Sequence, residues 1–469
     1  MKTWFVLLVT LGFLTGCAST AQQSAEEIYQ QRQGLQQIWQ GYDPLARGVG
    51  YYHANDGHII LALDTSTPPA NFSQLSPGVW RSNEPFPRLR QTYYINTEFD
   101  DTTATVLRYP QVDRNPFNTL FHEDFHGYQR DHFVNGMQTT TLSRFDTGSI
   151  PMDTLVAALE SERALLSAAL NTDDVERREQ VLLEYAGLRL WREAQLPTES
   201  VGIERRIETI EGTANWVGYR GEQQLLGYSD EAFTNELLSD LGVDYEGING
   251  SVTMRLMTAR VYSTGAALSE ILTKVAEHQW QVSVEQESAT LFDTLLDAFE
   301  WPQDSLTATG ERFIATEEFT QAIESAARYS WPDSDDWTLD RVEREHSWKL
   351  TLYLLPTSSA GFVATSGTFT PLDDNMILLH PVSQFDMETD SVGIEINDLT
   401  MTYQTGQTAL VESGHMDLVP LTLYLKEVDS SLQCPDDERS CEGSTNSISQ
   451  RGLSVEGQTP LLYQLERLN

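Results

Sequence analysis

Two histidines one helical turn apart are the part of this chain best suited to chemistry. They are His122 and His126, in the stretch TLFHEDFHGYQ at residues 119–129, and Glu123 follows the first of them. If the stretch is helical, both imidazoles project from one face, which is the geometry that one metal ion requires of two histidine ligands. Glu123 then points to a neighbouring face, from which it can reach a water molecule near the metal without binding the metal. The pattern therefore predicts a zinc site with a carboxylate base beside it.

The same stretch also has a purely structural interpretation, in which the histidines are ordinary buried side chains with polar partners. The apolar residues around them indicate a buried helix: Leu120, Phe121, Phe125, Tyr128 and Phe133. Two histidines and a glutamate on one buried helix are costly unless something compensates them. A metal ion supplies that compensation, so the helix favours a metal site over a structural role.

A catalytic zinc site needs a third protein ligand, and a later glutamate is the best candidate. No histidine or aspartate follows the pair at short spacing, but IETIEGTANWVGY at residues 207–219 contains Glu211. On a helical wheel Glu211 lies nearer the apolar stripe than Glu208, which predicts that Glu211 is the acid closest to the core. Gly212 and Ala214 follow it and leave room for another helix to approach.

Glu160 competes with Glu211 for this role. It lies in AALESERALL at residues 157–166, between the histidine pair and Glu211. It could complete the ligand set, or it could orient a ligating histidine through a hydrogen bond. Glu211 is preferred, and Glu160 stays open as ligand or supporting residue.

A tyrosine in a later helical stretch is a further candidate. Tyr262 stands three residues before Gly265 in ARVYSTGAALSEIL, a segment rich in small residues. A tyrosine hydroxyl can donate a hydrogen bond to an oxyanion in the transition state of a hydrolysis. The alternative is a core aromatic residue on a packed helix.

Taken in chain order, these motifs resemble the gluzincin metallopeptidases, the clan of thermolysin-like and aminopeptidase-like enzymes. The order is His-Glu-x-x-His, then Glu-Gly-x-Ala, then Tyr-x-x-Gly, over roughly the middle third of the chain. The resemblance implies one zinc ion per chain, bound by His122, His126 and Glu211. It also implies that Glu123 is the general base and that Tyr262 stabilises the oxyanion.

The chain departs from the gluzincin pattern in three respects. Residues 127–210 separate the second histidine from Glu211, which leaves room for extra helices. Ile210 stands where the aminopeptidases have asparagine. No Gly-x-Met-Glu-Asn stretch precedes the histidines, so the amine-binding site of an aminopeptidase is not evident.

The N-terminus indicates export and lipid attachment. MKTWFVLLVTLGFLTGCAST carries Lys2 before an apolar run too short to span a bilayer, which is typical of a signal peptide. The tetrad ending at Cys17 resembles a bacterial lipobox, which implies cleavage after residues 1–16 and acylation of Cys17. Ala18, rather than aspartate, favours the outer membrane, facing the periplasm or the exterior. Residues 17–45 are expected to be the lipidated N-terminus and a tether, with a short helix in the glutamine-rich residues 28–40. The alternative is a plain cleaved signal with a stray cysteine.

Charge and cysteine content narrow the choice of partners. The formal net charge is −39, and such a field repels phosphate, so nucleic acid is excluded as a partner. Cys434 and Cys441 lie in the short polar stretch QCPDDERSC. In an oxidising compartment we expect them to form a disulfide.

The elements that must position these residues fall into three blocks, which predict an α+β fold. Strand patterns precede residue 110, helical patterns follow from the histidines to about residue 330, and strand patterns return beyond WPDSDDW at residues 331–337. We predict a zincin-like catalytic domain at 46–335, with an N-terminal β-sheet followed by a mainly helical part. A C-terminal all-β sandwich-like module at 338–469 follows, for an unknown partner. By analogy with zincins, the strand at 103–110 is expected to be an edge strand beside the cleft.

These expectations combine into one function and one alternative. The function is a zinc-dependent metallopeptidase that hydrolyses peptide bonds of a peptide or protein substrate through a zinc-activated water, with Glu123 as general base. The alternative is a non-catalytic or non-peptidase zinc-binding surface lipoprotein with a zincin-like fold. The intact Glu123 argues against a non-catalytic scaffold, because a site that only binds zinc has no need of a base.

Overall fold

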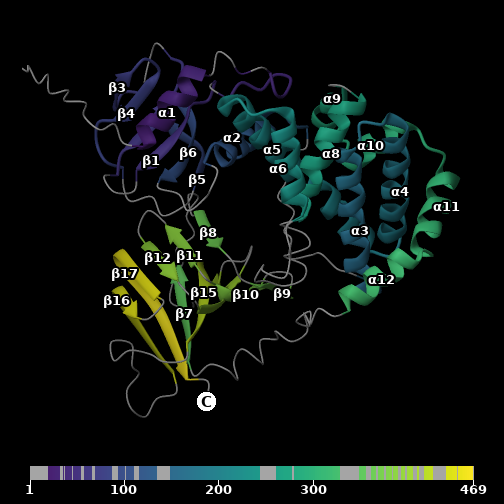
Figure 1. The fold of residues 1–469 in the computed structure, drawn as a ribbon. Helices are drawn as coiled ribbons and strands as arrows, with labels where there is room; N and C mark the ends of the chain where they lie inside the picture. Colours follow the sequence, from purple (N-terminus) through teal and green to yellow (C-terminus); the bar gives the residue numbers. More distant parts are fainter. Residues whose placement is uncertain are drawn as a thin grey trace, which may run out of the picture.

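The fold is described by a computed structural model of the 469-residue chain. It describes residues 20–31, 35, 37–44, 46–53, 57–65, 69–86, 93–100, 102–109, 116–134, 148–242, 260–276 and 279–327, together with the strands between 348 and 467. The chain is mixed α/β, with a six-stranded sheet near the N-terminus followed by helices (Figure 1). Cys17 and Cys434 lie outside the described residues, and so do the predicted lipid attachment and disulfide.

The N-terminal sheet has the strand order β3-β4-β2-β1-β6-β5. Its strands are β1 (Val49–His53), β2 (Ile59–Ala62), β3 (Phe72–Ser76), β4 (Val79–Ser82), β5 (Tyr93–Phe99) and β6 (Thr102–Tyr109). All neighbours are antiparallel except β1 and β6, which run parallel, and strands β2 to β5 lie between these two in the sequence.

The prediction of an edge strand at residues 103–110 is wrong. Strand β6 pairs with β1 on one side and with β5 on the other, so its backbone groups are used within the sheet. The edge belongs to β5, which packs against the histidine helix as β6 does. Sequence alternation shows that a segment is a strand but does not show which strands flank it.

A second correction concerns the tether. Residues 20–27, which the sequence places in a tether, form helix α1 (Thr20–Gln31) together with the first residues of the glutamine-rich stretch 28–40, for which a short helix is expected. Ala25 and Ile28 lie three residues apart on one face of this helix, and both are fully buried against the sheet. These two apolar residues among polar ones give the helix a narrow contact stripe that its overall composition hides.

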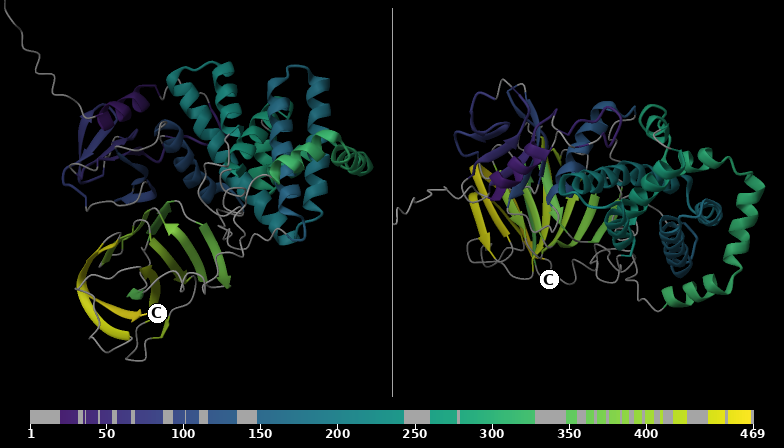
Figure 2. Two further views of the ribbon diagram at one scale, coloured as in Figure 1. Left: turned by 60° about the horizontal axis from the view of Figure 1, so that its bottom comes forward. Right: turned by 45° about the horizontal axis from the view of Figure 1, so that its top comes forward.

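Ten helices are assigned in the described residues between 116 and 327. They are α2 (Pro116–His132), α3 (Met152–Asn171), α4 (Val175–Glu193), α5 (Thr198–Leu226), α6 (Asp230–Leu241), α8 (Arg260–Ala276), α9 (Gln279–Gln286), α10 (Leu291–Phe299), α11 (Gln303–Ile314) and α12 (Glu317–Ala326). Helix α2 lies between the sheet and α5, and α5 packs against α8 as well (Figures 1 and 2). None of the described helices is both long enough and apolar enough to cross a membrane.

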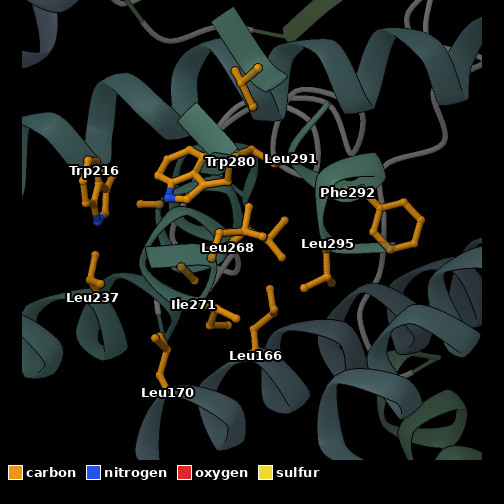
Figure 3. Packing of buried hydrophobic residues seen from close by; sticks show 14 of the residues in the cluster. Leu166, Leu170, Trp216, Leu237, Leu268, Ile271, Trp280, Leu291, Phe292 and Leu295 are labelled. Carbon is orange, nitrogen blue, oxygen red and sulfur yellow. The ribbon is translucent and has the colours of Figure 1, made fainter. Parts of the chain in front are cut away.

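The largest apolar core lies among the helices. Leu166 of α3, Leu268 of α8 and Leu295 of α10 converge there, with Trp280 of α9 beside them (Figure 3). These side chains are at most 1% exposed. This core holds α8 against α5 and so determines where the functional side chains of both helices lie.

Eleven C-terminal strands join one further hydrogen-bonded sheet. They are β7 (Trp348–Leu354), β8 (Gly361–Thr365), β9 (Thr368–Asp373), β10 (Met376–Val382), β11 (Gln384–Glu388), β12 (Val392–Ile396), β13 (Leu399–Gln404), β14 (Ala409–Leu410), β15 (Asp417–Leu425), β16 (Ser440–Gln450) and β17 (Leu453–Arg467). The predicted sandwich-like packing concerns side chains outside the described part of this region and stays a prediction.

Candidate metal centre

The two histidines lie on α2 as the spacing predicts. The helix begins at Pro116, whose fixed φ suits a first helical position. His122 and His126 are 7% and 4% exposed, and their ring centroids are 4.6 Å apart at 88°. Both imidazoles therefore share one face of the helix, and that face is buried.

Glu211 of α5 completes a three-residue group with them. Its Oε2 lies 3.5 Å from Nε2 of His122 and 3.1 Å from Nε2 of His126. One ligand atom from each residue falls within 4.8 Å of the others. Tetrahedral zinc with bonds of about 2.0–2.2 Å keeps its ligand atoms roughly 3.3 Å apart. The three side chains thus fit one ion, and they could hold a metal of this size without moving far.

The Glu211 carboxylate favours a positive charge close to it, between the two histidines. Burial alone would lower the pKa of His126, but the Glu211 carboxylate raises it to about 9. Burial disfavours the charge of Glu211, yet the two histidines hold the pKa of that carboxyl well below its usual range. Without a metal the carboxylate is stabilised by a proton on His126, and a metal ion would take the place of that proton.

A glutamine fixes the orientation of His126. The Gln129 side chain is fully buried, and its Oε1 lies 2.7 Å from His126 Nδ1. Its Nε2 donates to the carbonyl oxygen of Ile210 and to Thr213 Oγ1, both at 2.8 Å. The carboxamide therefore accepts from Nδ1, leaves Nε2 of His126 facing Glu211, and ties α2 to the turn of α5 that carries Glu211.

The sequence reasoning assigned no role to Gln129. Its position three residues after His126, on the same helix face, is the signal that could have revealed it. The acceptors on Ile210 and Thr213 come from a distant segment and could not be read from this spacing.

Asp124 anchors the histidine helix to the sheet and was also missed. It is fully buried, and it accepts hydrogen bonds from Tyr42 Oη at 2.9 Å and from Thr105 Oγ1 of β6 at 3.0 Å. Burial raises the pKa of Asp124 to about 7, although these two donors and Arg47 oppose the rise. The carboxyl lies on the opposite side of α2 from the metal group. Its hydrogen bond with Thr105 fixes the position of α2 relative to the sheet.

Glu123 is suited to act on a proton beside the metal group. The residue is 8% exposed, and its Oε2 is buried without a hydrogen-bond partner. Burial raises the pKa of Glu123, and the neighbouring histidines oppose that rise. A carboxylate in this position could accept a proton from a water molecule beside the metal group.

Tyr262 lies next to the histidines. Its ring stacks on His122 with centroids 5.6 Å apart and an interplanar angle of 9°. It sits in the first turn of α8, where its backbone oxygen accepts a hydrogen bond from Asn215 Nδ2 at 3.4 Å. The tyrosine is thus within the same cluster of side chains as the predicted ligands.

Glu160 lies outside the histidine–glutamate group. Its side chain is 39% exposed and pairs with Arg163 Nη2 of the same helix at 3.0 Å. The group of ligand-type side chains contains Glu211 instead.

The choice of Glu211 is supported, but the wheel argument behind it is wrong. Glu208 is fully buried, whereas the Glu211 side chain is 20% exposed. Glu208 accepts hydrogen bonds from Arg189 Nη1 at 2.6 Å and from Thr264 Oγ1 at 2.5 Å. Helix α5 is surrounded on nearly all sides, so its polar residues are buried through ion pairs that a one-sided apolar stripe does not reveal.

Comparisons with known proteins give no relative of this chain from which a role of the site could be inferred. No family model matches the chain, no curated protein matches it, and no solved structure matches it.

Proposed function

We propose that this protein is a zinc-dependent metallopeptidase whose ion is held by His122, His126 and Glu211. The observation that carries the proposal is the convergence of these three side chains beside a buried glutamate with an unused oxygen. Two histidines and a glutamate are a ligand set of catalytic zinc sites, which keep a fourth position open. A purely structural zinc site would have four protein ligands and no need of Glu123.

The residues would divide the work of peptide hydrolysis among them. Bound zinc would supply a Lewis acid that polarises the scissile carbonyl and lowers the pKa of the attacking water. Glu123 would accept the proton of that water and deliver it to the leaving amine. Tyr262 would donate a hydrogen bond to the oxyanion, and Gln129 would keep His126 in its ligating orientation.

The proposal also covers the cellular location of the protein and the role of its C-terminal region. Cys17 would carry the acyl chains that anchor the protein to the outer membrane, and residues 338–469 would form a sandwich-like module for a further partner. A Cys434–Cys441 disulfide would suit that oxidising compartment. The catalytic part would be zincin-like in fold.

The first test is the metal content and the activity of the purified mature protein. We expect about one zinc per chain, and we expect both His122→Ala and His126→Ala to lose it. Glu123→Gln should keep the metal but lose about 10²–10⁴-fold in peptide hydrolysis, because it removes the general base. Glu160→Gln serves as the control, since it makes the same carboxylate-to-amide change on an exposed side chain.

Three results would count against the proposal in different ways. If a variant with both His122→Ala and His126→Ala still bound one zinc per chain, the assignment of the metal site would be wrong. A zinc-loaded parent that cleaves nothing in a broad peptide library would favour a binding role or hydrolysis of another substrate. A Glu123→Gln variant that cleaves peptides as fast as the parent would remove Glu123 as the general base.

A further inference from the structure

The face of α5 that carries Glu211 continues as a line of polar side chains toward the C-terminus of the helix. Asn215 and Glu222 follow Glu211 by four and eleven residues, so at 100° per residue all three lie within about 40° of one another. The N-terminal part of α2 packs against the same stretch, because a Cβ on Gly218 would meet the carbonyl oxygen of Asn118 at 2.8 Å. Gly218 lies about 20° from Glu211 on the same helix face. Helix α2 therefore packs on this line between the metal group and Glu222.

Helix α6 adds two carboxylates to this line. Asn215 Nδ2 lies 3.3 Å from Asp240 Oδ2 and 3.4 Å from the backbone oxygen of Tyr262. Asp240 is thereby connected to the tyrosine that stacks on His122. Glu236 lies one helical turn before Asp240, and its charge raises the pKa of Asp240 further than burial alone does. We call the set formed by Glu222, Glu236, Asp240, Tyr219 and Tyr228 the acidic face.

Glu222 of the acidic face has one buried carboxylate oxygen without a hydrogen-bond partner among the described residues. The residue is 2% exposed, and the oxygen without a partner is Oε1. Burial, and then the charge of Glu236, raise the pKa of Glu222 to about 7. A buried polar atom left without a partner costs about 1–3 kcal/mol. An unpartnered buried oxygen of this kind is a candidate for a hydrogen bond or ion pair with a bound ligand.

No cation within the described chain neutralises this set. Arg220 is the nearest basic residue in sequence to Glu222, and it pairs with Glu270 at 2.6 Å and with Asp230 at 3.1 Å. Among the residues that the structure describes, no ion pair involves Glu222, Glu236 or Asp240. In contrast, the buried carboxylates Glu204 and Glu208 each have an arginine partner. The missing cation is thus a local property of the acidic face.

Two tyrosines give the acidic face a second property of cation sites. Burial raises the pKa of Tyr219, and the charges of Asp240, Glu236 and Glu222 raise it further. Tyr228 is 44% exposed, and after burial the charges of Glu222 and Glu236 raise its pKa as well. Aromatic rings beside carboxylates are the surroundings that an ammonium or guanidinium group prefers.

We infer that the acidic face binds a lysine or arginine side chain of an extended peptide substrate, several residues away from the bond that is cleaved. The inference rests on the proposed peptidase function. Eleven helical residues separate Glu211 from Glu222, which is about 16 Å along α5. An extended peptide advances about 3.3 Å per residue, so a cationic residue roughly three to five positions from the scissile bond would reach the acidic face.

The test compares matched peptides that differ in one charge. Starting from a peptide that the zinc-loaded parent cleaves, lysine and norleucine are exchanged at each position from the second to the sixth on either side of the bond. We expect lysine at one or two positions on one side to lower KM by about tenfold, which is a usual size for one partly buried charge pair. Glu222→Gln and Glu236→Gln should each remove most of that preference and leave cleavage of the norleucine peptide unchanged.

Glu231→Gln is the matched control, because it removes one charge from an exposed position of α6 outside the acidic face. Equal loss of preference in Glu231→Gln would show that overall charge, and not the acidic face, attracts the peptide. A parent without any positional preference for lysine would overturn the inference. So would Glu222→Gln and Glu236→Gln variants that both fold, judged by melting temperature, and keep the preference.

Binding to the Glu123→Gln variant separates this inference from the proposed function. Its affinity for fluorescent lysine and norleucine peptides is measured by anisotropy and does not depend on hydrolysis. Tighter binding of the lysine peptide that is lost in Glu123→Gln/Glu236→Gln would support the acidic face even if the parent cleaves no peptide. Equal binding of both peptides would overturn it.

Discussion

At the scale of single residues, the metal group depends on how each ligand is held. Glu211 contacts both imidazoles directly, whereas Gln129 acts on the group only through Nδ1 of His126. Glu160 pairs with Arg163 and is not part of the group formed by the histidines and Glu211. The three residues therefore differ in how directly they would affect a bound metal. Glu211 would be a ligand, Gln129 orients a ligand, and Glu160 has no role in the metal group.

This ranking predicts an order of zinc affinities. Glu211→Gln should weaken zinc binding most, because it removes a ligand of the ion. Gln129→Ala should weaken it by about 10–100-fold, which is the usual effect of losing an orienting hydrogen bond, and Gln129→Glu should recover part of the loss. Glu160→Gln should bind as the parent does. Competition with a graded chelator measures all four variants, and a Glu160→Gln variant that releases zinc first would reverse the assignment.

At the scale of secondary-structure elements, α5 is the helix on which the site is built. It carries Glu211, faces α2 on one side and contacts α8 on another. Its buried acids Glu204 and Glu208 pair with arginines of α4 and α8, which fixes the helices against one another. Gly212 of α5 meets Gly265 of α8 so closely that a Cβ on either would overlap the other helix. This contact brings the first turn of α8, and Tyr262 with it, up to the histidines.

The glycine contact predicts that a glycine-to-alanine substitution has opposite effects on stability inside and outside the contact. Gly265→Ala should lower the free energy of unfolding by about 1–3 kcal/mol, because its methyl group would strike the Glu208 carbonyl and the Gly212 backbone. Gly202→Ala, on the exposed part of α5 with no atom within 4 Å of its Cβ, should leave stability unchanged or raise it by up to about 1 kcal/mol. Urea unfolding followed by circular dichroism compares them. If both variants unfold at the urea concentration of the parent, the close packing of α5 on α8 is not as described.

At the scale of the whole molecule, charge and attachment set where the protein can work. A net charge of −39 makes the surface repel anionic partners and attract cationic ones. The acidic face would then be a specific site within a generally favourable field for basic peptides. Long-range attraction is screened within about 8–10 Å at physiological salt, so only contact residues can give positional preference.

The lipobox resemblance predicts how the molecule is held on the membrane. Cys17→Ser should move the protein from the membrane fraction to the soluble fraction, because acyl chains and no described helix would provide the anchor. Fractionation with detection by antibody measures this, and the parent treated with detergent is the control for release. A Cys17→Ser protein that is exported and still sediments with membranes would contradict the proposed anchor.

The sequence by itself determined what depends on a single segment. The spacing of His122 and His126 predicted that they share one helix face, because four residues make about one turn wherever the helix lies. The strand patterns before residue 110 and the helical patterns that follow them also resulted from local periodicity, and the structure contains both. Gly212 as a point of helix contact also followed from composition alone.

Only the tertiary structure decided which segments meet. The burial of Glu208, the hydrogen bonds of Gln129 to α5, the inner position of β6 and the docking of α1 on the sheet all depend on partners far away in the chain. A local pattern specifies which face of an element is apolar. It does not specify which residue stands opposite, because that choice results from packing the whole set of elements into one core.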